Sequence, residues 1–120
     1  MASGNPYTTF GYKGKQVRDN IHAHDVINAF YHFYQNPRRG EVYNLGGGRE
    51  SNISVMEAIK KAEDLTGKKA KVIYKDMSRI GDHIWYIFDM SKFRFHYPKW
   101  KLTKSMNSIF EEIAGSTIKV

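Results

Sequence analysis

The segment from Ser54 to Gly67 constrains the fold more than any other, because both ends of one helix are marked in it. Ser54 and Glu57 have the spacing of a capping box, in which each side chain satisfies a backbone N–H group of the first turn. Apolar residues then recur every three or four positions, which is typical of a helix with one apolar face. Glycine readily adopts the left-handed backbone that ends a helix. The sequence therefore predicts an amphipathic helix that ends at Gly67.

Further helices and short extended segments alternate with this helix along the chain. Helices are expected over residues 25–35, 89–95 and 105–113, and extended segments over residues 16–18, 41–45, 70–74 and 84–88. Such alternation predicts an α/β fold, with α+β-like character, in which three to four helices accompany a small sheet. A length of 120 residues is typical of one domain, so we expect a single domain over residues 1–120, with residues 1–3 as a possible tag or new start.

Composition narrows the classes of partner and compartment. The chain has no cysteine, which excludes disulfides and thiolate metal sites. Lys and Arg total 19 against 12 Asp and Glu, and the net charge of +7 attracts polyanions such as nucleic acid, anionic lipid or a phosphate ligand. No apolar run approaches the length of a membrane helix, and residues 1–6 have no feature of a signal peptide. We expect a cytoplasmic protein without a membrane partner.

A glycine run over residues 46–48 lies between an expected strand and an expected helix, which is the setting of a dinucleotide-binding fingerprint. Ser51, however, stands where that fingerprint needs glycine or alanine for close packing. The helix also begins late, near Ser54. We therefore interpret the run as a structural turn.

Two other patterns have ordinary explanations. Tyr97 and Lys101 match the Tyr-x-x-x-Lys pair of short-chain dehydrogenases, but that chemistry needs both side chains on one helix face, and Pro98 opposes a continuing helix. His22, His24 and Asp25 are clustered without the spacing of a zinc motif, so a helix-capping or core role is favoured for them.

Two arginines are candidates for anion binding, since a guanidinium matches phosphate oxygens in a bidentate way. Arg18 and Arg79 lie in separate segments and could hold a diphosphate from both sides. From spacing alone, the simpler interpretation is favoured, in which each is an ordinary surface residue or pairs with nearby Asp19 or Asp82. The mixed basic and aromatic residues 92–97 also suit single-stranded nucleic acid, although their spacing suits a core as well.

Three blocks of sequence resemble, in order, successive segments of the extended short-chain dehydrogenases that act on nucleotide sugars. The resemblance covers residues 4–114, and the phrases around Arg18 and Arg79 are most similar to CDP-tyvelose (CDP-paratose) 2-epimerases. The blocks are residues 9–11 with 16–25, residues 41–48 with 54–57, and residues 79–82 with 89–92.

The resemblance implies roles for individual residues. Arg18 and Arg79 match the two arginines that hold the substrate diphosphate. Phe10 matches an aromatic residue beside the nucleobase, and Asp82 a residue that accepts from the ribose in some members. Asn20, where many members have tyrosine, occupies a further nucleoside-binding position. These residues form the predicted site, with no metal ligand and no catalytic residue among them.

The resemblance is to the C-terminal, substrate-binding part of the family, since the glycine fingerprint for NAD and the catalytic Tyr-x-x-x-Lys helix find no match here. In the family, NAD is bound by the other half, so we expect no cofactor in this chain. We also expect no enzyme activity of the chain alone. It is expected to bind a CDP- or UDP-linked sugar weakly or not at all, and to self-associate through the face that the other half would cover. The alternative is a non-catalytic interaction module whose basic surface binds nucleic acid or a protein partner.

Overall fold

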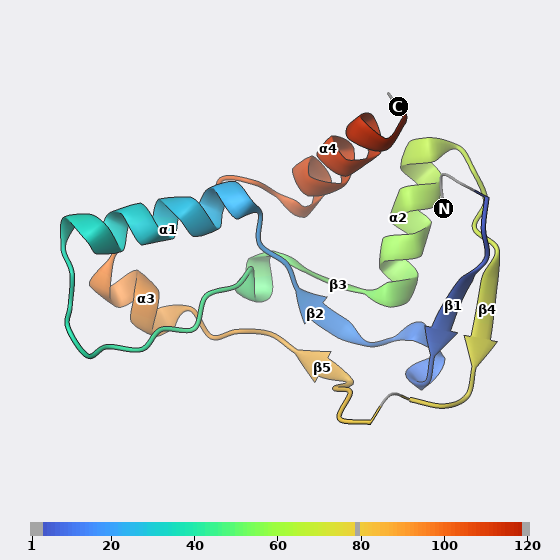
Figure 1. Cartoon of the computed structure of the whole chain (residues 1–120), viewed down its shortest axis with the longest axis horizontal. Helices are drawn as coiled ribbons and strands as arrows, with labels where there is room; N and C mark the ends of the chain where they lie inside the picture. Colours follow the sequence, from blue (N-terminus) through green and yellow to red (C-terminus); the bar gives the residue numbers. More distant parts are fainter. Residues whose placement is uncertain (1–3, 79, 119–120) are drawn as a thin grey trace.

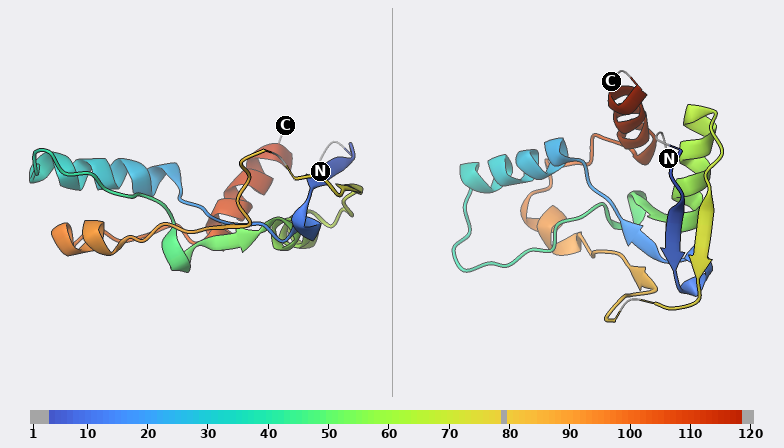
Figure 2. Two further views of the ribbon diagram at one scale, coloured as in Figure 1. Left: turned by 90° about the horizontal axis from the view of Figure 1, so that it is seen from below. Right: turned by 45° about the vertical axis from the view of Figure 1, so that its right-hand side comes forward.

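The computed structural model describes residues 4–78 and 80–118, and it is flat and extended (Figure 1). Its principal extents are 47 × 36 × 19 Å, and the left view of Figure 2 shows its thin dimension. The radius of gyration is 16.9 Å, compared with about 14 Å for a compact domain of this length.

Two small sheets carry the strands. In the first, β1 and β4 pair in parallel, with Tyr7 opposite Val72. In the second, β2 lies in the centre, antiparallel to β3 and parallel to β5. The strands are β1 (Tyr7–Phe10), β2 (Val17–Asp19), β3 (Asn52–Ser54), β4 (Val72–Lys75) and β5 (Trp85–Tyr86).

The helices largely follow the expected boundaries. They are α1 (Ala23–Gln35), α2 (Val55–Thr66), α3 (Ser91–His96) and α4 (Met106–Ile118), with single 3₁₀ turns η1 (Tyr12–Gly14) and η2 (Gly48–Glu50). The capping box of Ser54 and Glu57 is present in both directions, and Gly67 ends α2 in the left-handed region with φ of 68°. In Figure 1, α1 and α3 lie at one end of the molecule, α2, β1 and β4 lie at the other, and β2, β3 and β5 lie between them. The predicted α/β fold, with small sheets and four helices, is thereby confirmed.

One predicted strand, residues 41–45, is wrong. This segment forms no ladder with any strand of the described chain, and it runs as irregular backbone from the end of α1 to the glycine turn. Tyr43 and Leu45 instead pack side chains against the hydrophobic cluster, while Val42 is exposed. The alternation of side chains is therefore real, but no neighbouring strand is available to pair with it. The short β3, by contrast, was not predicted.

The main hydrophobic core lies between α1 and α3 and is mostly aromatic. Its buried members are Ala29, Met90, Phe93, Tyr97 and Trp100. Phe93 and Trp100 meet edge to face with ring centroids 5.2 Å apart, a geometry that adds to the gain from burial.

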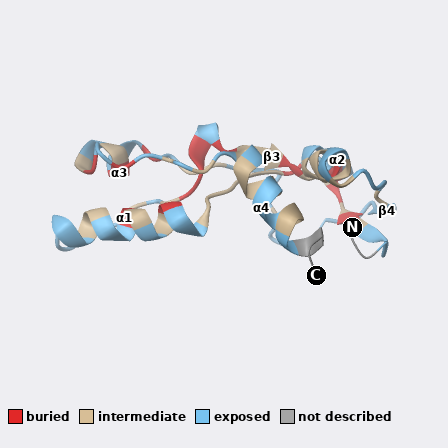
Figure 3. Cartoon of the chain, turned by 90° about the horizontal axis from the view of Figure 1, so that it is seen from above, coloured by how far each residue is buried: buried red, intermediate tan, exposed pale blue. Residues whose placement is uncertain are grey.

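Many large apolar side chains stay outside this core, and Figure 3 shows that much of α1 is exposed or half-buried. On α1, Phe30 is 64% exposed and Tyr34 is 80% exposed, and on α3 Phe95 is 81% exposed. Apolar patches of this kind favour association, so the predicted self-association has a surface to act through and stays a prediction. None of the described helices combines the length and apolarity that a membrane span requires.

Candidate functional site

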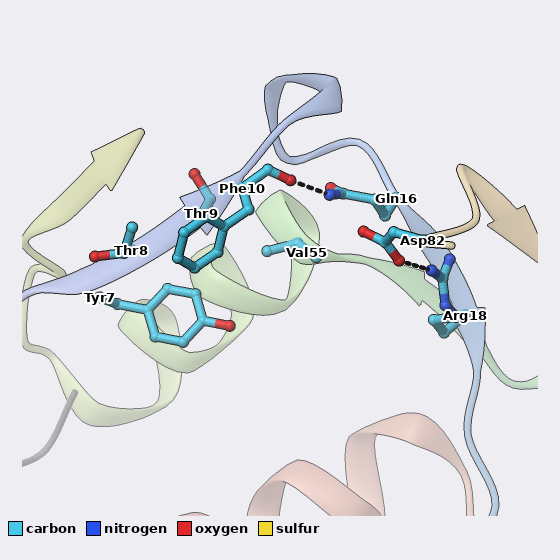
Figure 4. Close-up of a pocket in the computed structure, with 8 residues that line it drawn as sticks. All are labelled: Tyr7, Thr8, Thr9, Phe10, Gln16, Arg18, Val55 and Asp82. Carbon is cyan, nitrogen blue, oxygen red and sulfur yellow. Dashed lines mark hydrogen bonds and ion pairs between the residues drawn. The ribbon is translucent and has the colours of Figure 1, made fainter. Parts of the chain in front are cut away.

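A pocket of about 170 Å³, here called the β1–β2 pocket, opens where the end of β1 approaches the start of β2 (Figure 4). Its walls come from β1, from the segment around β2, from the first residue of α2 and from the loop before β5. The lining residues are Tyr7, Thr8, Thr9, Phe10, Gln16, Arg18, Val55 and Asp82. Three of the predicted site residues, Phe10, Arg18 and Asp82, are thus brought together in one place.

Arg18 lies in the middle of β2, and its side chain is about one-third exposed. One guanidinium nitrogen donates to Asp82 Oδ1 at 2.7 Å, and another donates to the Val17 carbonyl at 2.9 Å. The pairing with Asp82 that the sequence left open is therefore present. A guanidinium has five N–H donors, so these two bonds fix its orientation and leave donor capacity toward the pocket.

Phe10 ends β1, and the chain turns sharply after it. Gly11 has φ of 65°, and a side chain there would crowd Ser78 at 2.8 Å, so this turn requires glycine. The parallel pairing with β4 places Lys75 opposite Phe10, and its ammonium lies 5.9 Å from the ring centroid. The pocket lining therefore combines an aromatic ring with one cationic group and one carboxylate, which suits an anionic ligand that also has a flat apolar part. Lys75 lies against the ring without lining the pocket.

The other two predicted site residues are Arg79 and Asn20. Arg79 lies outside the described residues. Asn20 follows β2, and its amide donates to the Arg18 carbonyl at 3.2 Å while its backbone N–H donates to Ser51. Asn20 does not line the β1–β2 pocket.

The glycine run is a structural turn, as predicted. A side chain at Gly46 would overlap the carboxylate of Asp19 and the ring of Phe88. The same carboxylate accepts from the backbone N–H of Gly48 at 2.9 Å and of Phe88 at 3.1 Å. Within the run, the N–H of Gly48 thus faces a protein carboxylate and the N–H of Gly46 faces the Met90 sulfur, so neither is directed at a pyrophosphate.

Tyr97 belongs to the core rather than to a catalytic pair. It caps the C-terminal end of α3, so the predicted break before Pro98 is confirmed. Its hydroxyl donates to the Asn36 carbonyl at 2.7 Å, and burial raises the pKa of the phenol. A tyrosinate base would need the opposite shift, with a lysine on the same helix face.

The histidine cluster has the predicted capping and core roles. His22 caps α1, and its Nδ1 accepts from the backbone N–H of His24 at 2.9 Å. Its other ring nitrogen contacts Glu112 on α4. Asp25 is fully buried and accepts hydrogen bonds from Thr103 and Lys104. Within residues 4–78 and 80–118, no group of three acidic or histidine side chains could hold a metal ion.

Sequence reasoning missed several lining residues, of which Gln16 is the most informative. It precedes β2 by one residue and lies two positions before Arg18. Side chains two positions apart on an extended chain share a face, so the spacing alone could have assigned Gln16 to the same pocket once Arg18 was chosen.

Comparisons with known proteins also point to enzymes that act on nucleotide sugars. Residues 1–46 match the model of the NAD dependent epimerase/dehydratase family. The chain is 39% identical over 61 residues to CDP-paratose 2-epimerase from Salmonella typhi, a match that covers 49% of this chain and 18% of that protein. It is 33% identical over 100 residues to dTDP-glucose 4,6-dehydratase from Xanthomonas campestris pv. campestris (strain B100), covering 77% of this chain and 28% of that one.

The fold is also similar to a solved structure. The UDP-glucose 4-epimerase of Thermotoga maritima, with UDP-glucose, superposes with a TM-score of 0.84 at 27% identity, covering 99% of this chain and 37% of that chain. The chain thus spans less than two fifths of each of these proteins. The expected similarity to nucleotide-sugar epimerases and dehydratases is therefore confirmed. That this chain corresponds to the C-terminal part of such an enzyme stays a prediction.

Proposed function

We propose that this chain is the nucleotide-sugar-binding portion of an NAD-dependent epimerase or dehydratase, and that the β1–β2 pocket receives the nucleoside diphosphate. The observation that carries the proposal is the meeting of Phe10, Arg18 and Asp82 in one pocket. These are three positions at which the family's nucleotide-contacting residues are expected, and Asp82 comes from a loop 64 residues after Arg18.

The proposed binding mode follows from the chemistry of each group. Arg18 donates to a phosphate oxygen with the N–H groups that Asp82 and Val17 do not engage, and charge-assisted bonds of this kind are about twice as strong as neutral ones. Phe10 offers a flat apolar surface to the base, and Lys75 beside it adds attraction for the phosphates. Asp82 orients Arg18 and supplies a carboxylate oxygen for a ribose hydroxyl.

The proposal assigns no redox step to this chain. Nucleotide-sugar epimerisation requires a hydride acceptor and a base, and neither the Gly46–Gly48 turn nor the Tyr97 hydroxyl is arranged for those roles. In this proposal the residues described here bind and orient the nucleotide, and other residues of a complete enzyme hold NAD and act on the sugar.

Isothermal titration calorimetry of the chain with CDP, UDP and UDP-glucose tests the proposal. We expect Arg18→Ala to weaken nucleotide binding about tenfold or more, because a hydrogen bond to a charged group is lost. Arg39→Ala is the matched control, since it removes the same charge from an exposed position that does not line the pocket.

Two results would contradict the proposal. The proposal commits to weak binding rather than none, so one such result is the absence of nucleotide binding by the unmodified chain at millimolar concentrations. The other is an equal effect of the two arginine variants. Titration with short single-stranded DNA at two salt concentrations completes the test. Tight DNA binding with a steep salt dependence, together with no nucleotide binding, would favour the interaction module instead.

A further inference from the structure

Helix α1 has a second apolar face, opposite the face that joins the core. The core face includes Ala29, which is buried, and Phe33, which packs against the hydrophobic cluster. On the other face, apolar side chains recur at positions i, i+3, i+4 and i+7, a spacing that places them together on one side of a helix. These residues, each at least 55% exposed and here called the α1 stripe, are Ile27, Phe30, Tyr31 and Tyr34.

The α1 stripe faces outward from the described part of the chain. The left view of Figure 2 shows α1 along one side of the thin molecule and α3 along the other. The Tyr31 hydroxyl accepts a hydrogen bond at 3.0 Å from Gln35, one turn further along the same helix, so this ring is held along the helix surface. No residue of the stripe lines the β1–β2 pocket, so the stripe is separate from the proposed nucleotide site.

The chain exposes more surface than a compact monomer of its mass. Its accessible area is 8735 Å², whereas a compact monomer of 13.9 kDa exposes about 6,700 Å². The surplus of about 2,000 Å² is more than twice the roughly 800 Å² that each partner buries in a protein–protein interface of standard size. The surface available is therefore large enough for a stable dimer.

The distribution of charge favours a second copy of this chain as the partner. The net charge is +7, so two copies repel each other when lysines and arginines face one another. Helix α1 contains no lysine, arginine or glutamate, and its one aspartate, Asp25, is fully buried. The α1 stripe is therefore a face on which two copies meet without opposing like charges.

We infer that two copies of this chain pair through the α1 stripe, with their α1 helices antiparallel about a twofold axis. A twofold interface requires a face that is complementary to itself. In this arrangement Phe30 of each copy meets Tyr31 of the other, and Ile27 meets Tyr34, so each contact joins two apolar side chains. Aromatic side chains at the centre are typical of the residues that dominate the affinity of an interface.

Sedimentation velocity at increasing protein concentration measures the association. We expect a reversible dimer, and we expect Ile27→Glu to weaken dimerisation about thirtyfold or more, because a carboxylate then occupies an apolar contact in each half of the interface. Ile113→Glu is the matched control, since it makes the same change on α4 at a residue that is 60% exposed, compared with 66% for Ile27. Circular dichroism checks the helix content of both variants.

Disulfide formation tests the antiparallel geometry, because the chain has no cysteine of its own. In the antiparallel pair, Ile27 of one copy lies beside Tyr34 of the other, so the two Ile27 residues are about 10 Å apart along the helix axes. That separation is too long for a disulfide. We expect Ile27→Cys mixed with Tyr34→Cys to form a linked dimer under mild oxidation, and Ile27→Cys alone to stay largely unlinked.

Three results would overturn the inference. A strict monomer at millimolar concentration would leave the stripe to a different partner, and equal effects of Ile27→Glu and Ile113→Glu would place the contact elsewhere. Linkage of Ile27→Cys alone as readily as the mixture would indicate parallel or unspecific pairing. The cysteine variants change exposed positions conservatively, so they test the pairing even if Ile27→Glu lowers the helix content.

Discussion

Replacing Asp25 by asparagine should destabilise the fold by an amount that depends on pH. Asp25 is fully buried at the start of α1, where one carboxylate oxygen accepts from the Thr103 hydroxyl at 2.6 Å. The other accepts from the backbone N–H of Lys104 at 3.0 Å. Asparagine has nearly the same shape. With its oxygen toward the N–H of Lys104, its NH₂ group can donate to the Thr103 hydroxyl, which accepts as well as donates.

The magnitude follows from counting those bonds. In that orientation the asparagine oxygen still accepts from the backbone N–H of Lys104, and the NH₂ group replaces the contact with the Thr103 hydroxyl. The bonds lose the negative charge of the acceptor, which should cost about 1–2 kcal/mol. Asp25→Ala removes both acceptors and should cost about 3–5 kcal/mol.

The pH dependence has a definite sign. Burial raises the pKa of Asp25, but hydrogen bonds from the Thr103 side chain and from the backbone of Lys104 and Thr103 outweigh it, so the pKa lies below its usual value. The unfolded chain therefore takes up the proton at a higher pH than the folded chain. The stabilisation is complete above the unfolded pKa, about 4, and is lost as the pH falls through the folded pKa.

Urea unfolding measures this effect, followed by the fluorescence of Trp100, whose indole donates to the Asp25 carbonyl. Exposed Trp85 also emits, so circular dichroism is recorded in parallel. Asp64→Asn, on the exposed surface of α2, is the control. Equal stabilities of the two variants at pH 7, or a constant difference between Asp25→Asn and the unmodified chain from pH 7 to pH 3, would refute this account.

Three further substitutions should each lower the free energy of unfolding. Ser54→Ala removes the cap that accepts from Glu57 and should cost about 1 kcal/mol in urea unfolding. Gly46→Ala places a methyl group against the Asp19 carboxylate and should cost about 1–3 kcal/mol; unchanged stability would contradict the tight turn. Tyr97→Phe removes a hydroxyl donor and should cost about 1 kcal/mol while leaving UDP affinity unchanged; a loss of affinity would reopen a functional role.

Local features were predictable because their causes lie within a few residues. The capping box at Ser54 and the left-handed end at Gly67 depend on contacts inside one helix, and both were recovered. Residues 41–45 have the alternation of a strand, but a strand also needs a partner at the correct distance, which no local pattern specifies. The opposite happened at β3, where three residues pair with β2 although so short a segment has no periodicity.

For the site, the sequence predicted which residues take part but not how they are arranged. Phe10, Arg18 and Asp82 were chosen by resemblance, and the structure supplies what the sequence could not, which is their distance from one another. Gln16 escaped notice because glutamine is an ordinary surface residue, and its burial depends on how the turn after β1 folds back over the start of β2.

The 19 Å thickness of the molecule has a consequence for its dynamics. In a layer this thin, few backbone amides are more than one side chain from water, so most can open without disturbing distant parts. Slow amide hydrogen exchange should therefore be confined to the helices around Trp100 and to the centre of α2, and the two ends of the molecule should exchange as separate cooperative units.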